Sequence, residues 1–294
     1  MKRLGCLGIA SVVGIYAILL GYGVVVVYPM IWMLYTSLKR DDAIFANPFQ
    51  LPDFADLRWV NYRNAWVVAK FGEYFGNSVL VTAVTLLLVL LLSSMAAYAL
   101  ARFSFPGAKP LLFYFLAGLM LPVQMAIVPL FFQMKSMGLL GTLHGLLLAY
   151  VASGLPFAVF VLTGFFRSLP ASLHESAVID GANELQAFWH IMRPLAKPGL
   201  VTVAIFSFLG TWNEFFMAFI FLSGEGATRF RTLPLGLANI AIVSQYRTDW
   251  GMAFAGLVMA MLPALLAYSL LQKHLTKGIT RGAGRGRRAG HCAT

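Results

Sequence analysis

The sequence predicts an all-α, polytopic membrane protein with six transmembrane helices and a two-helix loop on the cytoplasmic side. Three observations lead to this class. Of the 294 residues, 60% are apolar and 11% are charged, whereas a soluble domain carries about 25% charged residues. The apolar residues gather into six runs, each long enough to cross a bilayer of about 30 Å as a helix. All 22 Lys and Arg residues lie outside these runs, and so do all but one of the 11 Asp and Glu residues.

The same composition excludes two other classes of chain. A soluble globular domain is excluded, because so few charged residues cannot cover a water-facing surface. A disordered chain is excluded because disordered chains have low hydropathy. The first apolar run is too long for the core of a signal peptide and lacks a cleavage site, so we expect it to be a retained span. The predicted spans are Gly8–Leu34, Val79–Leu100, Leu111–Phe132, Leu143–Phe166, Leu200–Leu222 and Met252–Leu271.

The basic residues indicate the orientation of these spans. If the N-terminus is cytoplasmic, the segments on that side carry 13 Lys and Arg residues and the opposite segments carry nine, in keeping with the positive-inside rule. An even number of spans then places both termini in the cytoplasm. The net charge of +11 is attributed to topology anchors that meet anionic membrane lipid, and no nucleic-acid partner is expected. A transmembrane domain over 1–286 and a flexible basic tail over 287–294 are predicted.

The sequence contains no motif for chemistry of its own. It has no GxxxxGK[ST] loop for a nucleotide and no HExxH motif, and its five His residues are scattered. Cys6 and Cys292 have no zinc-site spacing, and on the cytoplasmic side a disulfide between them is disfavoured. We therefore expect neither an enzyme nor a bound metal or cofactor.

Several connections and spans have unusual features. On the outer side, Lys39–Phe75 interleaves aromatic residues that either lie at the membrane interface or pack on a partner. Gly224–Gly251 is a second outer connection. Pro122, Pro129 and Pro156 interrupt the third and fourth spans, either as packing kinks or because they line a cavity.

The most informative segment is Arg167–Pro198, between the fourth and fifth spans. It is far longer than the about 2–8 residues that usually join adjacent helices of a bundle. Pro170 suits the first turn of a helix over Ala171–Ile179. Gly181 then turns the chain, because glycine adopts backbone angles that other residues avoid.

A second helix, Glu184–Met192, is predicted after that glycine. Asn183 and Gln186 have the spacing of a capping box, and Pro194 is expected to end the helix. Both helices carry apolar residues at three- and four-residue steps. An apolar face outside the bilayer is buried against the lipid interface, the protein's own spans or a separate partner, and composition alone does not choose among these.

This segment resembles the EAA loop of importer-type ABC transporter permeases. The family pattern is Glu-Ala-Ala, then a glycine four residues on, then Ile-x-Leu-Pro. Glu175, Ala177, Gly181, Ile191 and Pro194 match it. Asp180-Gly181-Ala182 is similar to the carbohydrate-uptake subgroup, to which maltose permeases belong. Further similar stretches, which extend the resemblance over nearly the whole chain, are Ala96–Phe103, Gly154–Phe157, Gly164–Arg167, Trp212–Phe215 and Asp249–Gly251.

The resemblance implies a function. In the family, the first helix of the loop is the coupling helix; it docks on a cytoplasmic ATPase and passes ATP-driven motion to the spans. The implied partners are an ATPase dimer that binds the ATP, a second homologous permease, an extracytoplasmic sugar-binding protein and a carbohydrate substrate, in a prokaryotic plasma membrane. Ser176 and Arg193 depart from the family pattern. The residues implied in ATPase coupling are Glu175, Ser176, Ala177, Asp180, Gly181, Ala182, Phe188, Ile191 and Pro194.

Glu214 is the one acidic residue inside a predicted span. Such residues are costly in a membrane and usually face protein or water. It contacts substrate hydroxyls, bonds a neighbouring helix or relays protons, and the last role is weakened because no second carboxylate accompanies it. Trp212, Asn213 and Glu214 are predicted to line or support the translocation path.

Two rival functions stay open on the residues alone. An ion-coupled carrier would need titratable sites in the membrane, and only Glu214 is available. A membrane enzyme would need a catalytic set that the sequence does not show. The favoured prediction is a transporter membrane subunit that imports a sugar or sugar-like solute by alternating access, with a separate ATPase as its motor.

Overall fold

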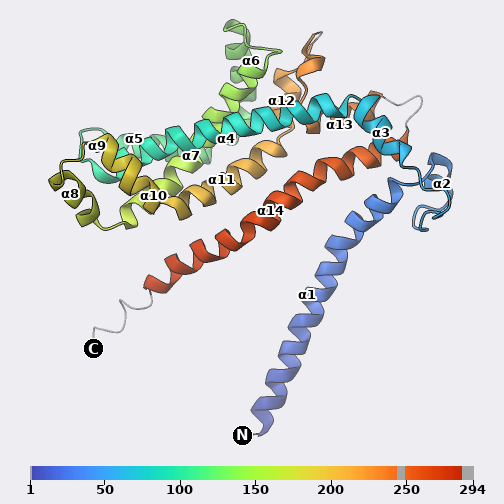
Figure 1. Cartoon of the computed structure of the whole chain (residues 1–294), viewed down its shortest axis with the longest axis horizontal. Helices are drawn as coiled ribbons and strands as arrows, with labels where there is room; N and C mark the ends of the chain where they lie inside the picture. Colours follow the sequence, from blue (N-terminus) through green and yellow to red (C-terminus); the bar gives the residue numbers. More distant parts are fainter. Residues whose placement is uncertain (1, 225, 244–248, 287–294) are drawn as a thin grey trace. The chain divides into compact units, whose positions relative to one another are not determined.

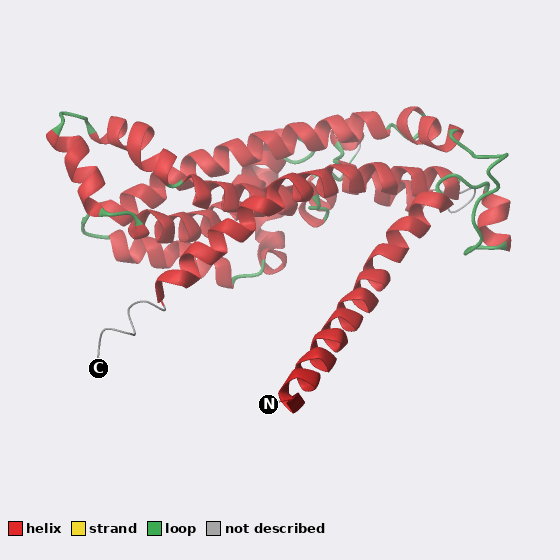
Figure 2. Cartoon of the chain, turned by 60° about the horizontal axis from the view of Figure 1, so that its bottom comes forward, coloured by secondary structure: helices red, strands yellow, loops and turns green. Residues whose placement is uncertain are grey.

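The structure is a computed structural model that describes residues 2–224, 226–243 and 249–286. Every regular element in these ranges is a helix (Figures 1 and 2), which confirms the all-α class. The predicted basic tail, 287–294, lies outside them. The longer helices are α1 (Lys2–Thr36), α4 (Phe71–Arg102), α5 (Ala108–Met120), α6 (Val123–Ser136), α7 (Leu143–Ser168), α11 (Lys197–Trp212), α13 (Leu233–Val243) and α14 (Trp250–Gly286). The shorter ones are α2 (Asp41–Ala46), α3 (Val60–Val67), α8 (Ala171–Ile179), α9 (Glu184–Ala187), α10 (Arg193–Leu195) and α12 (Phe216–Phe221).

Four of the predicted spans coincide with continuous helices. Ser11–Thr36, α4, α7 and Trp250–Leu270 are each long and apolar enough to cross a membrane. Two bent pairs pass the same test together: α5 with α6, and Glu184–Leu195 with α11. The described chain therefore has between four and six candidate spans, and the count of six stays a prediction.

The third predicted span, Leu111–Phe132, is not one helix. α5 and α6 meet at Leu121 and Pro122 with a bend of 103°. Leu121 is extended (φ −90°, ψ 114°), because a residue before proline is disfavoured in the helical region and the proline has no N–H to donate. Pro129 and Pro156 lie inside continuous helices, so of these three prolines only Pro122 lies at a break between helices.

The fifth predicted span, Leu200–Leu222, is also interrupted. α11 ends at Trp212, and the chain turns through 213–215 before α12 begins. No proline or glycine lies in this turn. The start of α12 is instead held by Glu214, whose carboxylate accepts backbone N–H groups there.

The loop between α7 and α11 forms two helical segments, as predicted. Gly181 adopts a left-handed φ of 87° after α8, and Asn183 and Gln186 form both hydrogen bonds of the capping box, at 2.9 Å each. The predicted stop at Pro194 was wrong, because helix continues through a π-helical turn, Phe188–Met192, and α10. A π-turn is a known way to accommodate a residue that cannot join the α-helical hydrogen-bond ladder.

The chain divides into two compact units, each described here by itself. The first contains the residues up to Gly72 together with Leu237–Met261, and the second contains Glu73–Gly236 together with the chain from Leu262 onward. The cavity and the loop considered below both belong entirely to the second unit.

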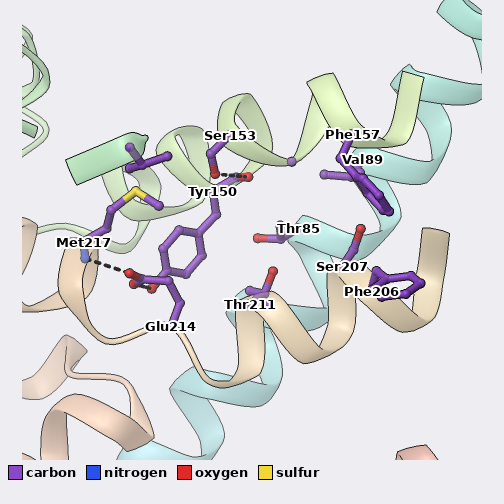
Figure 3. A pocket seen from close by; sticks show the side chains of 13 residues that line it. Thr85, Val89, Tyr150, Ser153, Phe157, Phe206, Ser207, Thr211, Glu214 and Met217 are labelled. Atoms are coloured by element: carbon purple, nitrogen blue, oxygen red, sulfur yellow. Dashed lines mark hydrogen bonds between the residues drawn. The ribbon is translucent and has the colours of Figure 1, made fainter. Parts of the chain in front are cut away.

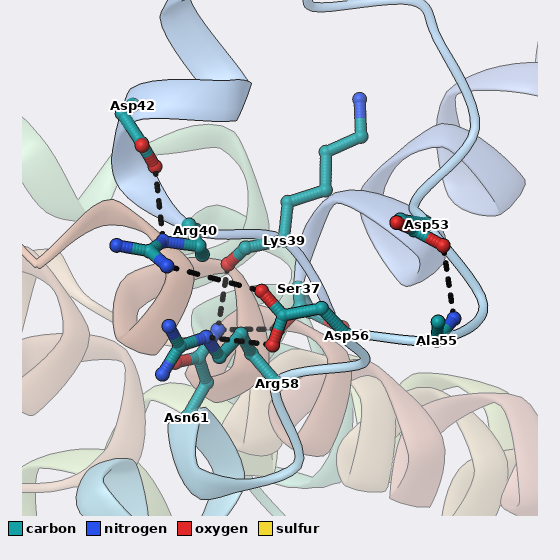
Figure 4. A network of polar contacts seen from close by, with 9 residues as sticks. All are labelled: Ser37, Lys39, Arg40, Asp42, Asp53, Ala55, Asp56, Arg58 and Asn61. Carbon is teal, nitrogen blue, oxygen red and sulfur yellow. Dashed lines mark hydrogen bonds and ion pairs between the residues drawn. The ribbon is translucent and has the colours of Figure 1, made fainter.

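In the first unit, polar contacts order the connection that follows α1 (Figure 4). Asn61 Nδ2 donates to the carbonyls of Ser37 (2.8 Å) and Lys39 (3.0 Å). Asp56 forms an ion pair with Arg58 (3.5 Å). Lys39 is buried, and this burial lowers the pKa of its ammonium group below the ordinary value. The predicted outer connection is thus a folded segment rather than a loose loop.

The start of α14 belongs to the same unit. Asp41 accepts the backbone N–H groups of Trp250 (3.2 Å) and Gly251 (2.9 Å), and it thereby satisfies donors that have no partner within the helix. The rings of Trp32 and Phe254 meet edge-to-face at 5.2 Å. These contacts connect α1 to the beginning of α14.

The second unit has two buried apolar clusters. One includes Leu146 and Tyr150 of α7 with Phe221 of α12. The other includes Phe166 at the end of α7 with Phe188 from the loop. α7 contributes to both clusters, so it is the central helix of this unit.

A close approach on α7 gives a test of this packing. A Cβ on Gly145 would overlap the backbone carbonyl of Leu139, whereas a Cβ on Gly164 meets no atom within 4 Å. We expect Gly145→Ala to cost about 1–3 kcal/mol, because the overlapping atom is backbone and cannot rotate away. Gly164→Ala should be neutral or stabilising by up to about 1 kcal/mol. Thermal unfolding of the full-length variants in detergent measures both; equal midpoints would contradict the packing.

Candidate functional site

A cavity of about 400 Å³ lies in the second unit, between α4, α6, α7, α11 and α12 (Figure 3). Its volume is within the range of small-molecule sites, about 300–1,000 Å³. Two aromatic rings, Phe157 and Phe206, lie 5.5 Å apart in its wall. The polar side chains that line it are Thr85, Tyr150, Ser153, Ser207, Thr211 and Glu214.

Glu214 joins three parts of this wall. Its Oε2 accepts the hydroxyl of Tyr150 on α7 at 2.5 Å, and its two carboxylate oxygens accept the backbone N–H groups of Met217 (2.8 Å) and Ala218 (3.2 Å). The first N–H groups of a helix have no partner within it, and in a membrane such orphan donors are costly. Of the three roles left open by the sequence, this geometry favours the bond to a neighbouring helix.

The hydroxyl groups of Thr85, Ser207 and Thr211 are directed into the cavity in Figure 3. Thr85 is 1% exposed, and its Oγ1 has no hydrogen-bond partner among the described residues. A buried hydroxyl without a partner is unfavourable. The cavity therefore presents hydrogen-bonding groups to whatever occupies it, next to an aromatic pair.

The three consecutive residues predicted for the translocation path have different surroundings in the structure. Only Glu214 lines the cavity. Trp212 is buried, stacked on Phe208 at a ring distance of 5.8 Å, and the amide of Asn213 donates to the carbonyl of Leu209 at 2.9 Å. Tyr150 was not among the residues predicted from the sequence. A lone carboxylate in a span needs a donor, and a Tyr in a neighbouring span was a signal for it.

The residues predicted for ATPase coupling fall into two groups. Most are exposed or partly exposed in α8 and the turn after it, among them Glu175, Asp180 and Gly181. Ala177 and Phe188 are 3% and 2% exposed. This chain itself covers both side chains, and their part in ATPase coupling stays a prediction.

The two helices of the loop differ in what covers their apolar faces. Phe188 and Met192 of the second helix belong to a core cluster with α4 and α7, so the protein's own spans bury them. On α8, by contrast, Leu173, Val178 and Ile179 are 39%, 46% and 84% exposed. α8 thus exposes apolar side chains, near Glu175 and Asp180, that no described residue of this chain covers.

Hydrogen bonds from Tyr98 connect the loop to the spans. The hydroxyl of Tyr98, near the end of α4, bonds His174 Nδ1 of α8 (3.1 Å) and donates to Glu184 Oε2 of α9 (3.3 Å). A hydroxyl has one hydrogen, so both bonds form when His174 carries a proton on Nδ1. The Tyr98 ring also contacts Phe166 (5.7 Å) and Phe188 (5.2 Å).

Arg102 makes a second connection at the same end of α4. Its Nη2 donates to the carbonyls of Phe166 (3.0 Å) and Leu169 (2.8 Å), which end α7 and precede α8. A displacement of α8 would therefore be passed directly to α4 and α7.

Long apolar helices around a cavity with polar side chains, and an exposed helix bonded to their ends, are features of a membrane-embedded transport subunit. Comparison with protein families agrees. The model described as "Binding-protein-dependent transport system inner membrane component" matches residues 89–281. The chain belongs to this family, the permease subunits of ABC importers.

Individual relatives are transport permeases as well. The diacetylchitobiose uptake system permease protein NgcG of Streptomyces coelicolor is 46% identical over 258 residues, covering 88% of this chain and 84% of the relative. The trehalose transport system permease protein SugB of Mycobacterium tuberculosis is 33% identical, with 83% and 87% covered. A solved bacterial ABC transporter for alginate import contains a chain with a TM-score of 0.76 and 25% identity, with 88% and 94% covered.

Proposed function

We propose that this chain is the permease subunit of an ATP-driven importer for a sugar or sugar-like solute, and that a separate ATPase drives its alternating access. The observation that carries the proposal is the exposed face of α8 on a chain of this family. The sequence offers no nucleotide loop of its own, so the energy comes from a partner.

The occupant proposed for the α8 face is that ATPase. Ile179 is 84% exposed, next to Asp180 and the left-handed Gly181. An apolar anchor flanked by carboxylates suits a groove with an apolar floor and cationic or amide donors at its rim. Small residues, Ser176 in α8 and Ala182 in the turn after it, allow the two backbones to approach closely.

The fastening of α8 explains how its motion would reach the cavity. Tyr98 and Arg102 connect the loop to the ends of α4 and α7. These two helices also contribute Thr85 and Tyr150 to the cavity wall. A rigid-body shift of α8 therefore changes the same helices that surround the cavity, which is the coupling that alternating access needs.

A sugar suits the cavity's chemistry. Thr85 has a hydroxyl without a partner among the described residues, Ser207 and Thr211 add two more, and Phe157 with Phe206 offers apolar ring faces. Sites for polyhydroxylated ligands combine such placed polar groups with aromatic walls. Diacetylchitobiose is the first substrate to assay, because the relative NgcG is named for its uptake.

The remaining partners and the orientation follow from the same proposal. A second homologous permease would complete the path, and an extracytoplasmic sugar-binding protein would deliver the solute. The most apolar stretch of α1 is long and apolar enough to cross the membrane, where lipid or the second permease would contact it. Both termini and α8 lie on the cytoplasmic side of a prokaryotic plasma membrane.

The hydroxyl of Tyr98 gives a test of the coupling. Tyr98→Phe keeps the ring in its cluster but removes the bonds to His174 and Glu184. Each hydrogen bond contributes about 1 kcal/mol, so the loss of both is expected to lower sugar uptake per ATP hydrolysed by about 25-fold while ATP hydrolysis continues. Tyr114→Phe, at a ring that is 74% exposed, is the control. An unchanged uptake-to-hydrolysis ratio in Tyr98→Phe would contradict the role.

Co-purification tests the proposal as a whole. We expect the full-length, tagged chain to capture an untagged ATPase and a second permease from its own membranes. Reconstituted with a sugar-binding protein, the assembly should take up sugar only when ATP is supplied. Ion-driven uptake by the chain purified alone would instead establish an ion-coupled carrier.

A further inference from the structure

A second cavity, of about 660 Å³, lies where α4 ends and α5 begins, beside the end of α7. It is separate from the cavity that contains Glu214, and no residue lines both. Three cationic side chains line it: Arg102 from α4, Lys109 from α5 and Arg167 from α7. No Asp or Glu residue lines it.

The described residues do not neutralise the positive charge of this cavity. Across the described ranges, no carboxylate lies within ion-pair distance of Arg102, Lys109 or Arg167. Arg102 uses one amino group on α7 carbonyls, but its Nε is buried without a partner. Arg167 makes a long bond of 3.4 Å to the carbonyl of Leu100. Three like charges around one hollow repel each other, so an anion would stabilise the site.

The surroundings indicate which kind of anion. Phe103 and Phe105 also line the cavity and are 37% and 40% exposed, and the apolar span of α4 ends at this point. The cavity is also lined by Gly107 and Ala108 at the start of α5, the end of a helix whose dipole favours negative charge. Cations beside exposed rings at the end of a span match a molecule with a phosphate head and apolar chains.

We propose that this basic cavity binds the phosphate headgroup of an anionic phospholipid, with its acyl chains lying along Phe103 and Phe105. Basic pockets between membrane helices are suited to such headgroups. The site is next to Leu169, the residue to which Arg102 is bonded just before α8. A bound lipid would therefore stabilise the junction between the spans and the loop at Leu169. The proposal does not depend on the identity of the transported solute.

Native mass spectrometry of the full-length chain in a non-ionic detergent tests this proposal, with dioctanoylphosphatidylglycerol as the probe and dioctanoylphosphatidylcholine as the neutral comparison. The test variant is Lys109→Gln/Arg167→Gln, since Arg102 also holds α7. The matched control, Lys135→Gln/Arg63→Gln, removes the same charges elsewhere. A basic residue near a lipid surface contributes about 1 kcal/mol, or about fivefold. We expect the test variant to bind phosphatidylglycerol about 25-fold more weakly and the control to bind it unchanged.

Each other outcome overturns the proposal. Equal binding of the two lipids by the natural chain would remove the need for an anionic headgroup. An unchanged affinity in the test variant, or an equal loss in the control, would place the lipid elsewhere. Glycerol 1-phosphate, the soluble headgroup fragment, distinguishes the sources of phosphate: binding as tight as that of the lipid would assign the cavity to a free phosphate ester.

Discussion

Ile179→Asp is expected to weaken binding of the ATPase on the order of 100-fold and to abolish ATP-driven uptake. Ile179 is 84% exposed on α8, so the change costs this chain little stability. In a docked interface the same position is a central apolar anchor, and truncating such an anchor costs about 2–4 kcal/mol. The new carboxylate would also lie near Glu175 and Asp180 and would be buried without a partner. Pull-down of the ATPase with the tagged, full-length permease measures the effect.

The control for this prediction is an identical change at another exposed apolar residue. Phe54→Asp, at a side chain that is 77% exposed in the first unit, should leave ATPase capture unchanged. Deleting Ser172–Ala182 should also abolish capture, but it would remove Ala177 and His174, which pack against or bond this chain. The point substitution is therefore the sharper test. Full ATPase capture by Ile179→Asp would remove α8 as the docking helix.

Glu214→Ala is expected to lower both stability and uptake, the latter by about tenfold or more. The change leaves the N–H groups of Met217 and Ala218 and the hydroxyl of Tyr150 without their acceptor. Each unsatisfied polar group costs about 1–3 kcal/mol, and no water in the bilayer core replaces the carboxylate. Thermal unfolding in detergent and sugar uptake in proteoliposomes measure the two effects.

Two further variants separate support of the wall from contact with the solute. Tyr150→Phe keeps both bonds from Glu214 to α12 and should have a smaller effect on stability. Thr211→Val removes a hydroxyl that lines the same cavity and that has no hydrogen bond among the described residues. A loss of uptake at unchanged stability would therefore come from a lost contact with the solute. Normal uptake and normal ATPase coupling in Glu214→Gln would show that the charge of Glu214 is not essential.

Much of the fold was predictable because the membrane imposes long apolar runs. The breaks in the third and fifth predicted spans were harder to predict. At Leu121 the signal was present in Pro122, but a proline inside a helix is often tolerated, as at Pro156. At Glu214 no helix-breaking residue is present. Its carboxylate accepts backbone N–H groups at the start of α12 and also the hydroxyl of Tyr150, far away in the sequence.

The candidate sites were predictable to different degrees. The loop was found because its glycine, capping box and prolines are local signals that need no tertiary information. Which of its residues face inward was not predictable, since Phe188 is buried against α4 and α7, which lie elsewhere in the sequence. The cavity depends on side chains from five helices, and Thr85 alone carries no signal that would assign it to a site.

Thiol labelling in intact cells tests the central claim most directly. In a chain with Cys6→Ser and Cys292→Ser, Ile179→Cys and Phe54→Cys are exposed to a membrane-impermeant maleimide. If a cytoplasmic ATPase binds α8, Phe54→Cys is labelled at once in intact cells. Ile179→Cys is then labelled only after the membrane is permeabilised. Labelling of Ile179→Cys in intact cells would place α8 outside, where no ATPase could reach it.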